Sequence, residues 1–129
     1  NAKGNFSTVA FRYADVLLSM AEIQNELNNG VTDTDINNYV RPITERAHSP
    51  IPEEATMSKE AFREFILDER GRELYWEGWR RQDLIRFGKF IEYARLAGYP
   101  AADNMVLFPI PPRVILESNN VVKNNPGYQ

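Results

Sequence analysis

The sequence predicts an all-α protein with an irregular, extended C-terminal tail, and three observations lead to this. Apolar residues recur at intervals of three and four along much of residues 9–96, as on one face of a helix. Residues that cap or stop helices, such as Ser58 and Asn29 with Gly30, stand at the ends of these segments. From Pro100 onward the helical period is lost.

The first predicted helix covers residues 9–28 and is apolar on two sides. One set comprises Phe11, Ala14, Leu18 and Ala21, and the other comprises Tyr13, Val16, Met20, Ile23 and Leu27. A helix with two apolar sides is flanked by two neighbours, as in helical bundles and repeats. Asn29 and Gly30 supply its left-handed stop.

A second predicted helix ends at Ala47 and is capped by Thr32 or Asp33, whose side chains can accept from the first free N–H groups. Pro42 either kinks it or divides it into two short pieces. The two helices together have about the length of one tetratricopeptide-like unit, roughly 34 residues. A proline-rich loop follows at residues 48–52.

The longest predicted helix is capped by Ser58 and extends over residues 59–77, with Gly78 available as its stop. Gly71 within it costs about 1 kcal/mol relative to alanine. We therefore expect another backbone or a large side chain to pass close to Gly71.

Shorter segments complete the prediction. Two short helices are expected around residues 81–87 and 89–96. A brief strand or extended piece is expected at residues 106–108, and residues 118–129 are expected to be extended and wrapped over the helices.

Composition excludes several classes of protein. A chain of 129 residues fits one domain, and its net charge of −3 argues against a nucleic-acid binder. With no cysteine and only His48, a disulfide, a thiol nucleophile or a zinc site is not expected, and we predict no metal and no cofactor. The chain starts at Asn1 without a methionine, so we expect a segment of a longer protein or a processed product.

Residues 69–86 combine acids, arginines and both tryptophans of the chain. Helical spacing places an apolar stripe and a line of carboxylates on one ridge: Phe62, Ile66, Glu69, Glu73 and Trp76. We therefore expect a partly buried charge network in which arginines pair the acids in a fork geometry. Its expected members are Glu69, Arg70, Arg72, Glu73, Glu77, Arg80, Asp83 and Arg86.

A glycoside hydrolase using Glu69, Glu73 and Glu77 is the enzymatic alternative. Such an enzyme needs one carboxyl group that stays protonated, through burial or a neighbouring carboxylate. Here arginines lie within three or four residues of each acid and favour its ionised form. The sequence therefore favours a structural network over catalysis, and we predict that the protein is not an enzyme.

Several aromatic residues are possible stacking platforms for a sugar ring. Tyr75 and Trp76 are predicted to lie mid-helix in the core, and Trp79 to pack against the charged stretch. Tyr128 is predicted to anchor the tail through a buried ring and a bonded hydroxyl. Tyr99 lies in a loop, where binding aromatics are commonly found, and is the candidate ligand-binding residue.

Four stretches resemble the C-terminal portion of the SusD/RagB family. The first is the run from Phe11 to Leu18, followed by Ala21, Glu22, Asn25 and Glu26. The second comprises Ile36, Asn37, Pro42, Ile43, Glu45, Arg46 and Ala47, with Thr44 and His48 where the family commonly has arginine and glycine. The third comprises Glu69, Arg70, Arg72, Glu73, Leu74, Glu77, Gly78, Arg80, Asp83, Leu84 and Arg86. The fourth comprises Phe108, Pro109, Ile110 and Pro111, and later Asn125, Pro126, Gly127 and Tyr128.

The resemblance implies a single helical domain over residues 1–129, with tetratricopeptide-like packing, within a longer lipoprotein of the bacterial outer membrane. It also implies nutrient binding at the cell surface, with glycans as the most frequent ligand class, and delivery to a SusC-like TonB-dependent transporter. The lipid anchor and most of the ligand site would lie outside this segment. A helical scaffold that binds only a protein partner is the alternative.

Overall fold

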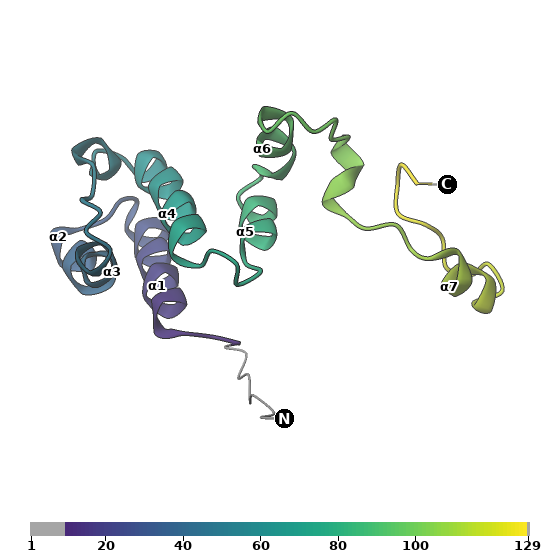
Figure 1. Ribbon diagram of the computed structural model, residues 1–129, viewed down its shortest axis with the longest axis horizontal. Coiled ribbons are helices and arrows are strands. Elements are labelled where there is room, and N and C mark those ends of the chain that lie inside the picture. The colour runs from purple at the N-terminus through teal and green to yellow at the C-terminus, as the bar shows by residue number, and fades with distance from the viewer. Residues whose placement is uncertain (1–9, 129) are drawn as a thin grey trace, which may run out of the picture. The chain divides into compact units, whose positions relative to one another are not determined.

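The computed structural model describes residues 10–128, and the chain falls into two compact units, Asn1–Arg80 and Arg81–Gln129. The described elements are helical throughout, and no strand occurs within residues 10–128 (Figure 1). This agrees with the all-α prediction. No helix of the described part is both long and apolar enough to cross a membrane.

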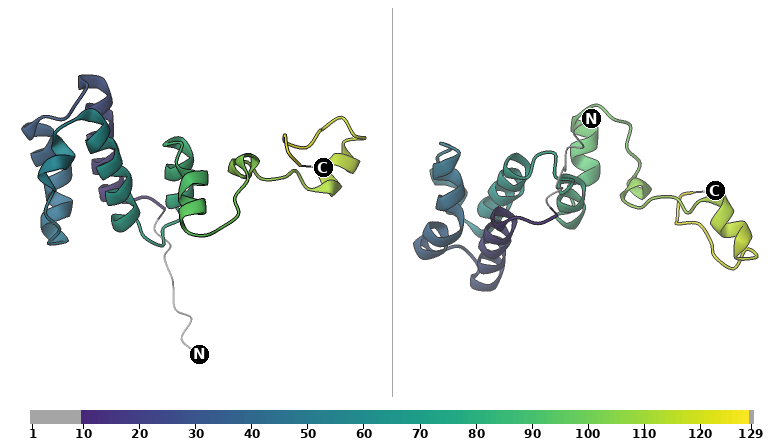
Figure 2. Two further views of the ribbon diagram at one scale, coloured as in Figure 1. Left: turned by 90° about the horizontal axis from the view of Figure 1, so that it is seen from above. Right: turned by 60° about the horizontal axis from the view of Figure 1, so that its bottom comes forward.

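The core of the first unit lies between helix α1 (Tyr13–Asn28), helix α4 (Lys59–Glu73) and the segment connecting them. α1 and α4 lie side by side in all views (Figures 1 and 2). Their buried faces meet the connecting segment in one apolar cluster, formed by Leu17, Leu18, Ala21, Ile36, Val40, Ile43, Ala55, Phe62, Phe65 and Ile66.

Only one of the two apolar sides of α1 is buried in this structure. Leu18 and Ala21 have no exposed surface, whereas Tyr13 is 73% exposed and Leu27 is 75% exposed. The helix begins at Tyr13 rather than at residue 9, which lies outside the described residues. Asn29 forms the left-handed stop, with φ 53°. With 16 residues, α1 is longer than α4 with 15, contrary to the prediction.

The connecting segment contains α2 (Asp33–Asp35), a π-helical turn (Ile36–Val40) and α3 (Arg41–Arg46). Thr32 caps α2 as predicted, because its hydroxyl accepts from the backbone N–H of Asp35. Pro42 lies in the first turn of α3, where its missing N–H needs no partner. The hydrogen-bond pattern thus changes ahead of Pro42, and the segment divides into short pieces. A 3₁₀ turn (Glu53–Thr56) then leads to α4.

Ser58 caps α4 as predicted, but the helix ends at Glu73 rather than near Glu77. At this end of the helix, Nη2 of Arg12 donates to the backbone carbonyl of Glu73. The N–H of Glu77, which would bond to that carbonyl if the helix continued, bonds to the carbonyl of Leu74 instead. The chain therefore turns after Leu74.

This turn overturns the prediction that Tyr75 and Trp76 are core residues. They are 72% and 88% exposed, and Trp76 has the left-handed φ of 65°. Trp79 is half-buried, with its ring 5.8 Å from that of Phe11. The expectation for Gly71 is confirmed, since a Cβ there would lie 2.6 Å from Nη1 of Arg80.

The second unit contains most of α5 (Arg80–Arg86), then α6 (Phe90–Leu96), a 3₁₀ turn (Asp103–Val106) and α7 (Pro112–Glu117). The last of these, α7, was not predicted. It begins with a proline at its first position, where the fixed φ suits a helix start. Leu107 is extended, but residues 106–108 form no strand.

The tail folds back on residues 104–110 instead of wrapping over the helices. The Nδ2 of Asn125 donates to the carbonyl of Phe108 at 2.6 Å, and the Oδ1 of Asn124 accepts from the N–H of Ile110 at 2.8 Å. Tyr128 is half-buried, and its hydroxyl donates to the carbonyl of Leu107 at 2.8 Å. The predicted anchoring by the Tyr128 hydroxyl is thus present.

Candidate functional site

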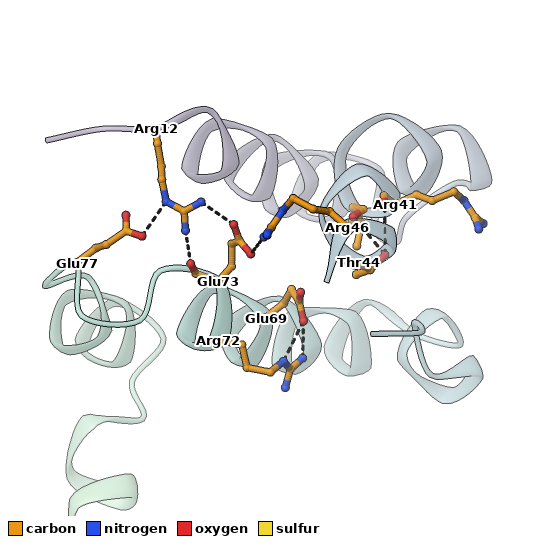
Figure 3. Close-up of polar contacts among 9 residues, drawn as sticks. Arg12, Arg41, Thr44, Arg46, Glu69, Arg72, Glu73 and Glu77 are labelled. Atoms are coloured by element: carbon orange, nitrogen blue, oxygen red, sulfur yellow. Dashed lines mark hydrogen bonds and ion pairs between the residues drawn. The ribbon is translucent and has the colours of Figure 1, made fainter. Parts of the chain in front are cut away.

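The charged residues of the stretch 69–86 form several separate ion pairs, and some of their partners lie far away in the sequence. Arg12, the residue before α1, lies between two acids, with Nη1 2.6 Å from Oε1 of Glu73 and Nε 2.7 Å from Oε1 of Glu77 (Figure 3). Arg46, at the end of α3, reaches the second carboxylate oxygen of Glu73. The Glu73 carboxylate thus links the end of α4 to the start of α1 and to the end of α3.

The charge of Arg12 follows from these contacts. Partial burial alone lowers the pKa of Arg12, but the hydrogen bonds to Glu73 and Glu77 and their negative charges outweigh it and raise the pKa above its ordinary value. Arg12 therefore stays protonated and holds the C-terminal end of α4 against the start of α1.

The remaining predicted members form pairs on other sides of α4 and on α5. Glu69 has a side chain 3% exposed, and its Oε2 alone accepts from both Nε and Nη2 of Arg72, at 3.0 and 2.6 Å (Figure 3). The buried Arg70 pairs with Asp15 at 2.8 Å.

Arg80 and Asp83 lie at the start of α5, on either side of the boundary between the two units. Arg80 donates to the carbonyl of Leu67 at 2.6 Å and reaches Asp68 at 3.3 Å, both on α4. In the second unit, the carboxylate of Asp83 is 2.9 Å from Nε of Arg86.

Sequence reasoning missed Arg12, Asp15 and Arg46 as partners in this cluster. A signal was present, since Arg12 and Asp15 stand within the run that resembles the family motif. Their distance from residues 69–86 in the sequence hid the pairing. No group of three His, Cys, Asp or Glu side chains suited to a metal ion occurs within residues 10–128.

Tyr99, the predicted ligand-binding residue, lies at a cavity of about 610 Å³ within the second unit. It follows Gly98, whose φ of 84° ends the turn after α6, and Tyr99 is 69% exposed. The cavity wall is largely apolar and includes the aromatic residues Phe90, Tyr93 and Phe108. Cavities of this size, apolar and with few polar groups, are typical of small-molecule sites.

Arg81 is the charged residue of this cavity, and sequence reasoning did not single it out. Its guanidinium carbon lies 4.1 Å from the ring centre of Phe108 and 4.9 Å from that of Phe90. Its Nη2 donates to the carbonyl of Val106 at 3.0 Å. Two rings and a carbonyl therefore fix the position of one positive charge at the wall.

Comparison with known proteins decides the family. A family model described as the SusD family matches residues 1–104 of the 129 in the chain. The chain belongs to the SusD family. The resemblance seen in the sequence motifs is thereby confirmed.

Relatives of this SusD-family chain are considerably longer. SusD-like protein P25 of Formosa agariphila is 40% identical over 86 residues, which cover 65% of this chain and 16% of P25. SusD-like protein P2 of the same organism is 30% identical over 131 residues, covering 93% of this chain and 26% of P2.

The crystal structure of a SusD homologue from Bacteroides thetaiotaomicron matches with a TM-score of 0.76 and 30% identity, over 92% of this chain and 26% of that one. The helical fold is thus that of the family, and tetratricopeptide-like packing is consistent with it. The chain spans about a quarter or less of the length of these proteins.

Proposed function

We propose that this chain is the C-terminal part of a protein that binds nutrients, most often glycans, at the surface of the bacterial outer membrane. The observation that carries the proposal is the SusD family match over residues 1–104. The full-length protein would be lipid-anchored and would pass its ligand to a SusC-like TonB-dependent transporter. Within this chain, Tyr99 would contact the ligand.

Binding rather than catalysis is supported by the environment of the three acids that a hydrolase would use. Glu69 is paired with Arg72, Glu73 with Arg12 and Arg46, and Glu77 with Arg12. A general acid must hold a proton at neutral pH. Each of these three carboxylates instead accepts a hydrogen bond from at least one guanidinium group. These acids suit an internal brace between helices.

Isothermal titration of the full-length protein against a panel of oligosaccharides and peptides tests the proposal. We expect heat with at least one oligosaccharide, and Tyr99→Ala to weaken its binding by about tenfold through the loss of ring contact. Tyr75→Ala is the matched control, because Tyr75 is similarly exposed, at 72%, but lies in the other unit. Hydrolysis of an oligosaccharide would instead revive the enzymatic alternative.

A helical scaffold that binds only a protein partner is the second candidate. It is favoured by the exposed apolar side of α1, which includes Val16 and Ile23, 50% and 47% exposed. Absence of heat with every oligosaccharide and peptide, together with tight binding to the transporter, would support the scaffold and contradict nutrient binding.

A further inference from the structure

Arg81 differs from every other arginine of the chain. Each of the others lies in a salt bridge with an Asp or Glu side chain, whereas Arg81 has no carboxylate partner among the described residues. It is nevertheless half-buried and fixed in position by Phe90 and Phe108. A fixed guanidinium without a counter-charge in this setting needs an explanation.

The contacts of Arg81 leave part of its guanidinium available. A guanidinium has five N–H donors. The hydrogen bonds of Arg81, at 3.0 Å to Val106 and 3.4 Å to Met105, both use Nη2. The N–H groups of Nε and Nη1 donate to no acceptor within the described part of the chain, so each remains able to donate to an anion such as a carboxylate.

The surroundings of the cavity favour an anion. Among the described residues that line it, Arg81 alone is charged. The nearby acids on α6 and in the following 3₁₀ turn are already paired, Glu92 with Lys89 at 3.3 Å and Asp103 with Arg95 at 2.8 Å. Arg81 itself is half-buried, and partial burial strengthens the attraction of a guanidinium for a negative charge.

We propose that this cavity binds an acidic sugar ring, a hexuronic acid residue of an oligosaccharide, with its carboxylate on Arg81 and its ring against Tyr99 or Phe108. This rests on the proposed function and names the ligand class of the same site. A cationic group would be repelled by Arg81, and an apolar group would cover its open N–H donors without pairing them. A neutral sugar would supply only hydroxyl acceptors, which carry no negative charge to neutralise the guanidinium.

The test compares two forms of one oligosaccharide, with free and with methyl-esterified carboxyl groups. Tetragalacturonic acid and its fully methyl-esterified form, with tetramers of glucuronic acid and of neutral glucose beside them, are titrated into the full-length protein. We expect the acid to bind more tightly than the ester. Arg81→Met, which keeps an apolar body between the two rings, should weaken binding of the acidic tetramer by about ten- to a hundredfold and leave the ester nearly unchanged.

Arg113→Met is the matched control. Arg113 lies on α7 in the same unit, its side chain is 86% exposed, and it is paired with Glu117 at 2.6 Å rather than placed at the cavity. We expect this variant to bind both tetramers like the unmodified protein. Arg81→Lys keeps the positive charge but lacks the planar guanidinium, so it should give an intermediate affinity for the acid. This variant replaces Arg81→Met in the test if Arg81→Met does not fold.

Two outcomes separate this inference from the proposed function. The acidic-sugar inference is wrong if the acids bind no better than neutral oligosaccharides, or if Arg81→Met weakens binding of acid and ester equally. Glycan binding still stands in that case, provided that neutral oligosaccharides bind and that Tyr99→Ala weakens their binding. If no oligosaccharide of either kind and no peptide binds, the proposed function itself fails.

Discussion

At the scale of single residues, Glu73 is the charge on which the first unit depends most. Its side chain is only 6% exposed, yet it carries a full charge that Arg12 and Arg46 neutralise from two other helices. A buried carboxylate is tolerated only while its partners remain in place. Removing the charge takes away the ion pair of Arg46 and leaves Arg12 paired with Glu77 alone.

We predict that Glu73→Gln lowers the free energy of unfolding by about 3 kcal/mol, the lower end of the range for breaking a buried pair. The lower end applies because Arg12 and Arg46 keep 32% and 64% of their side-chain surface exposed. Urea unfolding of the full-length protein measures the change. Glu92→Gln, which removes an exposed pair with Lys89, should cost less than about 1 kcal/mol, and equal losses would mean that the Glu73 cluster is solvated.

Gly71 gives a second prediction, since alanine would gain about 1 kcal/mol in helix propensity there. The added Cβ would displace the Arg80 guanidinium, which now donates to the Leu67 carbonyl at 2.6 Å. A hydrogen bond to a charged group contributes about 1.5–3 kcal/mol, so Gly71→Ala should be destabilising by about 1 kcal/mol.

In a protein that already carries Arg80→Met, adding Gly71→Ala should leave the free energy of unfolding unchanged or raise it, because the guanidinium that would clash with the new Cβ is absent. A double-mutant cycle in thermal unfolding measures this coupling. Additive effects of the two changes would show that Arg80 does not need a glycine at position 71.

The sequence could predict these charges but only some of their partners. Helical spacing correctly brings Arg72 to Glu69, three residues away. The partners of Glu73 stand 61 and 27 residues away, and no local pattern encodes such a pairing. Trp76 shows the reverse error, because a local pattern placed it in a helix that ends at Glu73, where the distant Arg12 bonds to the last carbonyl.

At the scale of elements, α1 and α4 are joined by charges at both ends, which shows that they run antiparallel. Arg12 at the start of α1 meets Glu73 at the end of α4, and Glu26 near the end of α1 meets Lys59 at the start of α4 at 2.6 Å. Arg63, one turn further along α4, also pairs with Glu26. The apolar cluster between them supplies the burial, and the terminal pairs set the register.

The ion pairs of Glu26 with Lys59 and Arg63 predict that the stability of the protein depends on pH. The hydrogen bond from Lys59 lowers the pKa of Glu26 most, burial opposes it, and Arg63 and the two positive charges add to the lowering. Because the folded pKa lies below the ordinary value of 4.5, the contribution is present above about pH 4.5 and is lost as the pH falls through the folded value.

We expect Glu26→Gln to remove part of the loss of stability between neutral pH and pH 3, as measured by urea unfolding at a series of pH values. Glu54→Gln is the control, since Glu54 is an exposed acid in the same unit. Identical pH profiles for Glu26→Gln and the unmodified protein would contradict the role of this pair.

Capping chemistry explains which elements the sequence revealed. Thr32 and Ser58 caps were predicted and found, because a hydroxyl bonds to an N–H only two or three residues away. α7 was missed because its six residues are too few to show a period, and because its own Pro112 and the preceding Pro109 and Pro111 indicate a break in helical structure. The tail is fixed by amide side chains such as Asn125, whose partner Phe108 is 17 residues away.

At the scale of the whole molecule, the first unit leaves one apolar stripe of α1 uncovered. The stripe comprises Tyr13, Val16, Met20, Ile23 and Leu27, spaced alternately by three and four residues along one face. Such spacing suits packing against another helix. Since the chain spans about a quarter or less of its relatives, we propose that the longer protein supplies that helix.

This proposal predicts opposite results for the segment and the full-length protein. Ile23, 47% exposed here, would be buried in the longer protein, so Ile23→Asp should lower the melting temperature of the full-length protein by several degrees, since an unpaired charge would enter an apolar contact. In the isolated 129 residues the same change should leave the melting temperature nearly unchanged and reduce self-association. Asn28→Asp, at an exposed polar position of the same helix, is the control for added charge. A full-length protein that tolerates Ile23→Asp as well as Asn28→Asp would show that the stripe stays open, and would favour a separate partner for α1.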